Sequence, residues 1–83
     1  EAKLCYLVYV SIHDVMETED VFKRAGIWND LVPTPREISS DCGMVIAVRV
    51  ADLERVERAL CLTDRQPDAV YWQTEGGYEE ISY

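Results

Sequence analysis

An uninterrupted apolar run near the start of the chain limits the possible folds more than any other feature. Residues 4–10 read LCYLVYV, with no charged residue, glycine or proline among them. A β-branched and aromatic run of this kind is typical of a strand that is buried on both faces. The chain has 83 residues, which is enough for one small domain. We therefore expect a single layered domain built around this strand.

A helix is expected directly after the run. Ser11 and Asp14 stand three residues apart, a weaker form of the capping box, in which glutamate or glutamine is usual at the last position. Gly26 suits the left-handed position that closes a helix. The apolar residues that would form its buried face are Val15, Met16, Val21, Phe22 and Ala25.

The rest of the chain alternates between strand and helix patterns. Strands are expected at 27–32, 44–50 and 69–73, and a second helix is expected with Asp52 as its N-cap. The apolar stripe of this second helix would be Leu53, Val56 and Leu60.

The order β-α-β-β-α-β predicts an α+β fold, the ferredoxin-like sandwich. Its four-stranded antiparallel sheet has the order 4-1-3-2, with both helices on one face. Residues 1–73 would form this domain, and residues 74–83, which contain two glycines and three glutamates, would be an acidic tail outside the core. The competing arrangement is a small open sheet with the tail paired to one edge.

The charge and cysteine counts exclude several classes of protein. With 16 acidic and 8 basic side chains the net charge is −8, which argues against a nucleic-acid partner. No apolar run is long enough to cross a membrane, and no signal peptide is visible, so we expect a cytoplasmic protein. The spacing of the three cysteines at 5, 42 and 61 matches no disulfide framework, zinc pattern or iron–sulfur pattern. No metal or cofactor is therefore expected.

The predicted topology brings one cysteine close to a helix start. The ends of the first two strands share one edge of the sheet, so Cys42 should emerge near Ser11 and His13. A helix N-terminus and an imidazole both favour the thiolate, and Arg36 adds positive charge. Asp41 opposes this effect.

Plainer readings of the same residues stay open. Cys42 can be a small buried residue, as most cysteines are, and His13 can be an exposed turn residue. Cys5 is expected in the core, and Cys61 at a helix end is expected to pack, although a Cys42–Cys61 pair is compatible with the pattern.

The segment 32–50, VPTPREISSDCGMVIAVRV, resembles the small bacterial and archaeal family of selenium/sulfur carrier-like proteins. The residues that carry the resemblance are Pro33, Pro35, Arg36, Ile38, Ser39, Cys42 and Gly43, with Ser11, His13, Glu19 and the Ala-Gly-Ile step at 25–27 upstream. The likeness extends over roughly residues 4–73, whereas Cys5, Cys61, Asp41 and the tail depart from the family pattern.

The resemblance implies a carrier that catalyses nothing by itself. A protein donor such as a cysteine desulfurase would place sulfur or selenium on Cys42, and an acceptor enzyme would remove it. Ser11, His13, Arg36, Ser39 and Gly43 would support the thiol.

Two other functions remain in view. The first is an accessory subunit of a redox or metabolic enzyme, which docks through the 33–43 loop and the acidic tail. Small domains of this fold often dimerise, so a homo-oligomer is also compatible with the sequence. The second is a sensor whose loop binds a small anion through backbone amides and Arg36.

Overall fold

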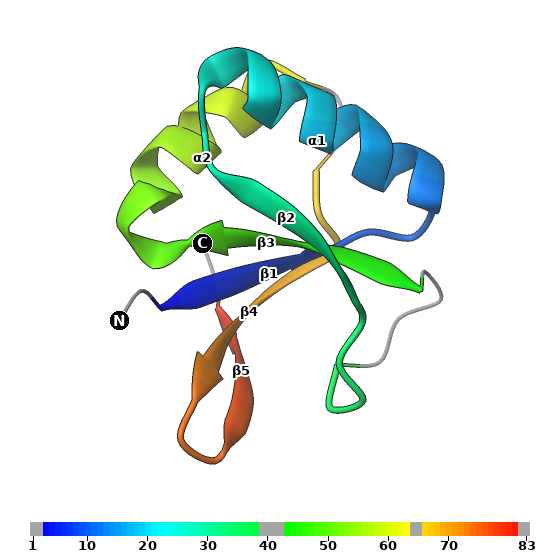
Figure 1. Ribbon diagram of the computed structural model, residues 1–83, viewed down its shortest axis with the longest axis vertical. Coiled ribbons are helices and arrows are strands. Elements are labelled where there is room, and N and C mark those ends of the chain that lie inside the picture. Colours follow the sequence, from blue (N-terminus) through cyan, green and yellow to red (C-terminus); the bar gives the residue numbers. More distant parts are fainter. Residues whose placement is uncertain (1–2, 39–42, 64–65, 82–83) are drawn as a thin grey trace.

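The computed structural model describes residues 3–38, 43–63 and 66–81. Its elements are β1 (Leu4–Val8), α1 (Ile12–Ala25), β2 (Asn29–Pro33), β3 (Met44–Arg49), the 3₁₀ turn η1 (Val50–Asp52), α2 (Leu53–Leu60), β4 (Ala69–Thr74) and β5 (Gly77–Ile81). The two helices lie on one face of an antiparallel sheet (Figure 1), so the α+β prediction is confirmed.

The sheet has five strands in the order β2-β3-β1-β4-β5. The first four strands keep the expected 4-1-3-2 order, but the prediction of a four-stranded sheet is wrong. Residues 77–81, expected to be an appendage, pair with β4 along the whole strand, from Gly77 opposite Thr74 to Ile81 opposite Val70. Glu75 and Gly76 form the turn between them, a connection in which glycine is favoured. An edge strand tolerates exposed charges, and for that reason its acidic composition resembled that of a tail.

The caps of α1 follow the sequence prediction. The Ser11 side chain accepts a hydrogen bond from the Asp14 N–H at 3.3 Å, and Gly26 has the left-handed φ of 72° that ends the helix. The expected buried face is only partly right, because Met16 and Ala25 are exposed and Thr18 is fully buried. The buried stripe is Val15, Thr18 and Phe22, at the three- and four-residue spacing of one helix face.

Asp52 precedes α2 at the N-cap position that the sequence predicted, but its side chain makes no capping hydrogen bond. The turn η1 runs directly into α2, so Asp52 already lies within a helical turn. Its carboxylate instead faces the guanidinium of Arg55 at 3.8 Å. The predicted stripe of α2 holds, with Val56 and Leu60 buried and Leu53 half-buried.

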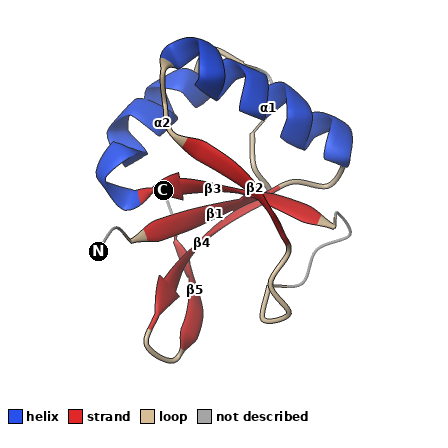
Figure 2. Ribbon diagram, in the orientation of Figure 1, coloured by secondary structure: helices blue, strands red, loops and turns tan. Residues whose placement is uncertain are grey.

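The sheet buries apolar side chains on both faces. On the helix side, Cys5 and Leu7 of β1 pack in one core with Phe22 of α1. On the other side, Tyr6 and Val8 belong to a second, smaller cluster. Figure 2 shows the β4–β5 hairpin and the turn at residues 34–38 on this side, opposite the helices. The prediction that the first strand is buried on both faces is thus confirmed for residues 4–8, whereas Val10, at the end of the predicted run, lies outside the strand and is 62% exposed.

Burial of Cys5 makes the fold sensitive to alkaline pH. Burial raises the pKa of its thiol above the ordinary value of 9.0, so above that pH the unfolded chain loses its proton first. We expect the Cys5 contribution to be complete below pH 9.0 and to be lost as the pH rises through the folded pKa. Urea unfolding at a series of pH values measures this loss. Cys5→Ala should lessen this loss of stability. Part of the loss should remain above pH 10.0, because burial also raises the pKa of Tyr6. An unchanged pH profile in Cys5→Ala would contradict the assignment.

Candidate functional site

The β2–β3 loop contains the predicted cysteine, and the structure describes both of its ends. Pro33 pairs with Met44, and just beyond them the Thr34 N–H donates to the Gly43 carbonyl at 3.0 Å. Cys42 and Ser39 lie outside the described residues. Gly43, which follows Cys42 in the chain, is exposed, and a Cβ added to it would meet no atom within 4 Å. The chain is therefore held at Gly43 in a position that is open to solvent.

Ile38 attaches the other side of this loop to the sheet. Its side chain is 2% exposed and belongs to the cluster on the face opposite the helices, together with Tyr6, Val8, Val45 and Ala47. The Ile38 N–H also donates to the Pro35 carbonyl at 3.0 Å, which closes a turn. The sequence analysis singled out Ile38 only through the family resemblance. Its isolated position in a polar loop gave no periodic signal of burial.

Arg36 is at the surface of this turn. Its side chain is exposed and forms no ion pair within the part of the chain that the structure describes. Its role toward a partner or an anion stays a prediction.

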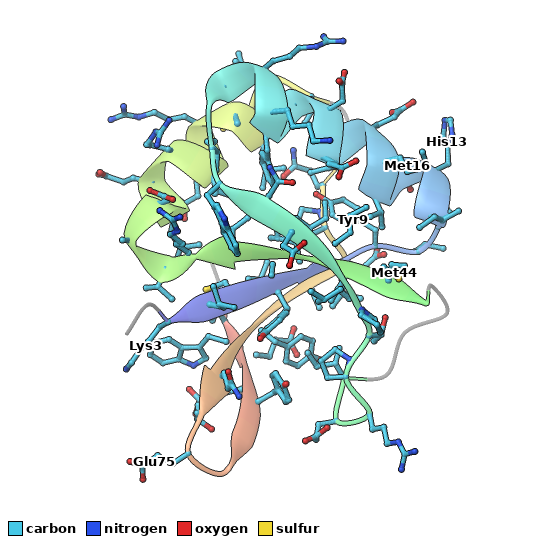
Figure 3. The ribbon with its side chains drawn as sticks, viewed as in Figure 1. Lys3, Tyr9, His13, Met16, Met44 and Glu75 are labelled. Carbon is cyan, nitrogen blue, oxygen red and sulfur yellow. The ribbon has the colours of Figure 1, made fainter. Side chains whose placement is uncertain are left out.

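Ser11 and His13 occupy the start of α1, where the sequence predicted them. The Ser11 hydroxyl caps the helix, and His13 Nε2 lies 3.0 Å from Glu17 Oε1. The His13 side chain is 73% exposed and projects from the helix into solvent (Figure 3). His13 is therefore engaged with its own helix, and an interaction with Cys42 stays a prediction.

The register of the sheet relates the start of α1 to the loop. β1 and β3 are antiparallel neighbours, with Leu7 opposite Ile46. The end of β1, which leads into α1, consequently lies beside the start of β3, which follows Gly43. This is the juxtaposition that the topology predicted for the described residues on each side.

The two described cysteines differ in accessibility. Cys5 is 0% exposed in the core, as predicted. Cys61 is exposed at the end of α2, so the expectation that it packs is wrong. α2 ends at Leu60, so the Cys61 side chain is not held on the buried face of the helix. Among the described residues no group of histidine, cysteine and acidic side chains could hold a metal ion.

A patch of exposed apolar side chains was missed by the sequence analysis. Val10, Ile12 and Met16 are 62%, 48% and 57% exposed at the β1–α1 turn and on the first helical turns. A helical projection gives the signal, because Val15, Thr18 and Phe22 share one face that excludes Met16. We call these three residues the apolar patch.

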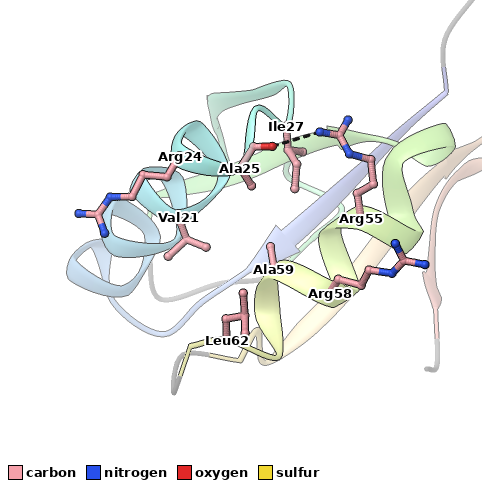
Figure 4. A pocket seen from close by; sticks show the side chains of 8 residues that line it. All are labelled: Val21, Arg24, Ala25, Ile27, Arg55, Arg58, Ala59 and Leu62. Atoms are coloured by element: carbon pink, nitrogen blue, oxygen red, sulfur yellow. Dashed lines mark hydrogen bonds between the residues drawn. The ribbon is translucent and has the colours of Figure 1, made fainter.

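A groove of about 540 Å³ lies elsewhere, between the C-terminal half of α1 and α2 (Figure 4). Three arginines border its apolar floor. The Arg55 guanidinium donates to the carbonyls of Ala25 and Gly26 at 3.1 and 3.2 Å, and Arg24 pairs with Asp20 at 2.6 Å. Two of the three arginines thus contact groups of the helices themselves, and the groove includes neither Ser11 nor the loop.

In the described chain, no helix has both the length and the apolar character that crossing a membrane requires.

Comparison with known proteins agrees with the resemblance noted in the sequence. The family model described as "Putative Se/S carrier protein-like" matches residues 4–71, which includes β1 to β3, both helices and the loop of Cys42. No curated protein and no solved structure matches the chain significantly. Since the matched residues make up most of the chain, the protein belongs to the selenium/sulfur carrier-like family.

Proposed function

We propose that the protein carries a sulfur or selenium atom on Cys42 and passes it to a partner enzyme. The family match is the observation that supports this most directly. The loop adds a structural reason, since Ile38 and the Thr34–Gly43 hydrogen bond hold its two ends while Gly43 stays exposed. A carrier needs a thiol that a large partner can reach, and this placement of the loop ends is suited to that need.

The chemistry of loading requires no outside oxidant. The Cys42 thiolate attacks the outer sulfur of a persulfide on the donor. A new S–S bond forms on Cys42, the S–S bond of the donor breaks, and the donor cysteine leaves as a thiolate. Delivery is the same exchange with the acceptor as nucleophile. The start of α1 and Arg36 would favour the thiolate that begins the sequence.

Mass spectrometry after incubation with a cysteine desulfurase and labelled cysteine tests the proposal. We expect Cys42 to gain the mass of one sulfur atom and Cys42→Ser to gain none at this position. The Cys61→Ser variant is the matched control, because it removes an exposed thiol and should still be loaded. The proposal fails if Cys42 stays unmodified while an established sulfur acceptor in the same mixture is loaded.

The accessory-subunit function is separated by the same variant. A Cys42→Ala protein that still binds its partner but no longer supports the sulfur-dependent activity agrees with a carrier. If both binding and activity survive, Cys42 has no chemical role and the domain acts by docking alone.

A further inference from the structure

We propose that the apolar patch of Val10, Ile12 and Met16 is the surface on which the protein that loads Cys42 docks. The inference rests on the proposed function, and it adds the chemistry of the partner surface. That surface would have an apolar centre surrounded by basic groups.

The first observation is the exposure of the patch. Its members are about half to two-thirds exposed, and all three belong to one seven-residue stretch, from Val10 to Met16. Ile12 and Met16 are four residues apart on α1, so they lie on one face of the helix. Single exposed apolar residues are ordinary, whereas adjacent ones mark an interaction surface.

The second observation is the position of the patch. Val10 follows β1, at the sheet edge where β3 begins after Gly43. Figure 3 shows Met16 and His13 near the end of the molecule where Met44 also lies. A partner that covers the patch therefore sits at the edge of the domain at which the cysteine loop joins β3.

The third observation is the charge around the patch. The first nine residues of α1, 12–20, contain Asp14, Glu17, Glu19 and Asp20. Lys23 and Arg24 pair with Glu19 and Asp20, and His13 contacts Glu17, so these pairs offset part of that charge. The net charge of −8 extends this field over the molecule. Charge complementarity favours a basic rim on the partner, and attraction of this kind raises the rate of encounter. These charges also oppose the pairing of two copies of the chain through this face.

Two routes of loading distinguish docking from chemistry. Polysulfide delivers a sulfur atom to a thiolate from solution and is left one sulfur atom shorter, so it needs no docking surface. A cysteine desulfurase must first bind the protein.

The double variant Ile12→Gln/Met16→Gln replaces the apolar side chains with neutral polar ones that are compatible with a helix. Leu62→Gln is the matched control, because Leu62 is 87% exposed and lies in the groove between the helices.

For the double variant we expect loading of Cys42 by the desulfurase to slow by about tenfold or more, as for central interface residues. Loading by polysulfide should be unchanged, and Leu62→Gln should match the parent protein in both assays. Added salt should slow the desulfurase reaction of the parent. Urea unfolding of the double variant checks that the fold is intact.

Each other result overturns the inference. Unchanged desulfurase loading means that the donor docks elsewhere. Equal slowing with polysulfide means that the substitutions act on the thiol and not on docking. A parent dimer that the double variant dissociates, with loading unchanged, assigns the patch to a second copy. Failure of the proposed function itself looks different, because the parent Cys42 then stays unmodified with both donors.

Discussion

Replacing Ile38 with alanine should lower the free energy of unfolding by about 3 kcal/mol, although Ile38 belongs to a loop. Its side chain is 2% exposed and fills a space between Tyr6, Val8, Val45 and Ala47. Truncation removes that apolar contact and leaves a cavity over the sheet. Urea unfolding monitored by tryptophan fluorescence measures the loss.

A local measurement shows whether the loop itself is released. Arg36 is exposed two residues before Ile38, so trypsin cleavage after Arg36 reports on opening of the turn. We expect faster cleavage in Ile38→Ala, and we expect Leu62→Ala to stay within about 0.5 kcal/mol of the parent. A loss below about 1 kcal/mol for Ile38→Ala, with cleavage unchanged, would show that Ile38 does not attach the loop to the sheet.

Removal of residues 75–83 should also cost about 3 kcal/mol, because it deletes β5. Tyr78 packs its ring edge-on against Tyr6 with centroids 5.4 Å apart, and Ile81 contacts the helix-side core. Both contacts disappear, and β4 becomes an unpaired edge that favours aggregation. Chemical unfolding together with light scattering measures the two effects.

The charge of β5 has to be separated from its pairing. The double variant Glu79→Gln/Glu80→Gln keeps the strand and removes two exposed charges, so it should leave the stability within about 0.5 kcal/mol of the parent. If the shortened chain is as stable as the parent, β5 contributes nothing to the domain. The family match ends at Tyr71, so β5 lies beyond the matched residues.

The two faces of the sheet hold two separate apolar clusters. The helix side holds the main core, and the opposite side holds the small cluster on which Ile38 rests. Both clusters therefore contribute to stability, and the smaller one also holds the described end of the loop at Ile38. The loop can be attached by a single apolar side chain because β1 and β3 already bury both of their faces.

Local signals were sufficient for most of the helices and strands. The run 4–10 predicted a strand buried on both faces, and Ser11 and Gly26 predicted the two ends of α1. These features depend on contacts between residues near each other in the chain, which a sequence pattern contains. The predicted N-cap position at Asp52 was right, but its side chain does not cap the helix, because the turn η1 precedes α2 directly.

The candidate site could be predicted only in part. The family resemblance supplied Cys42 and its neighbours as candidates, but burial of Ile38 depends on a sheet face assembled from β1 and β3. The apolar patch escaped notice because its residues are hydrophobic and close to the buried stripe of α1. Whether Met16 faced the core or the solvent depended on the helix phase, which Thr18 fixes by taking the buried position.

By itself the sequence determined the α+β class, the order of the first four strands and the caps of α1. The tertiary structure alone decided that residues 77–81 complete the sheet, that Ile38 holds the loop and that Val10, Ile12 and Met16 face solvent. The physical reason is the range of the interactions. Caps, turns and periodic burial act over a few residues, whereas edge pairing and the second cluster join segments that are far apart in the chain.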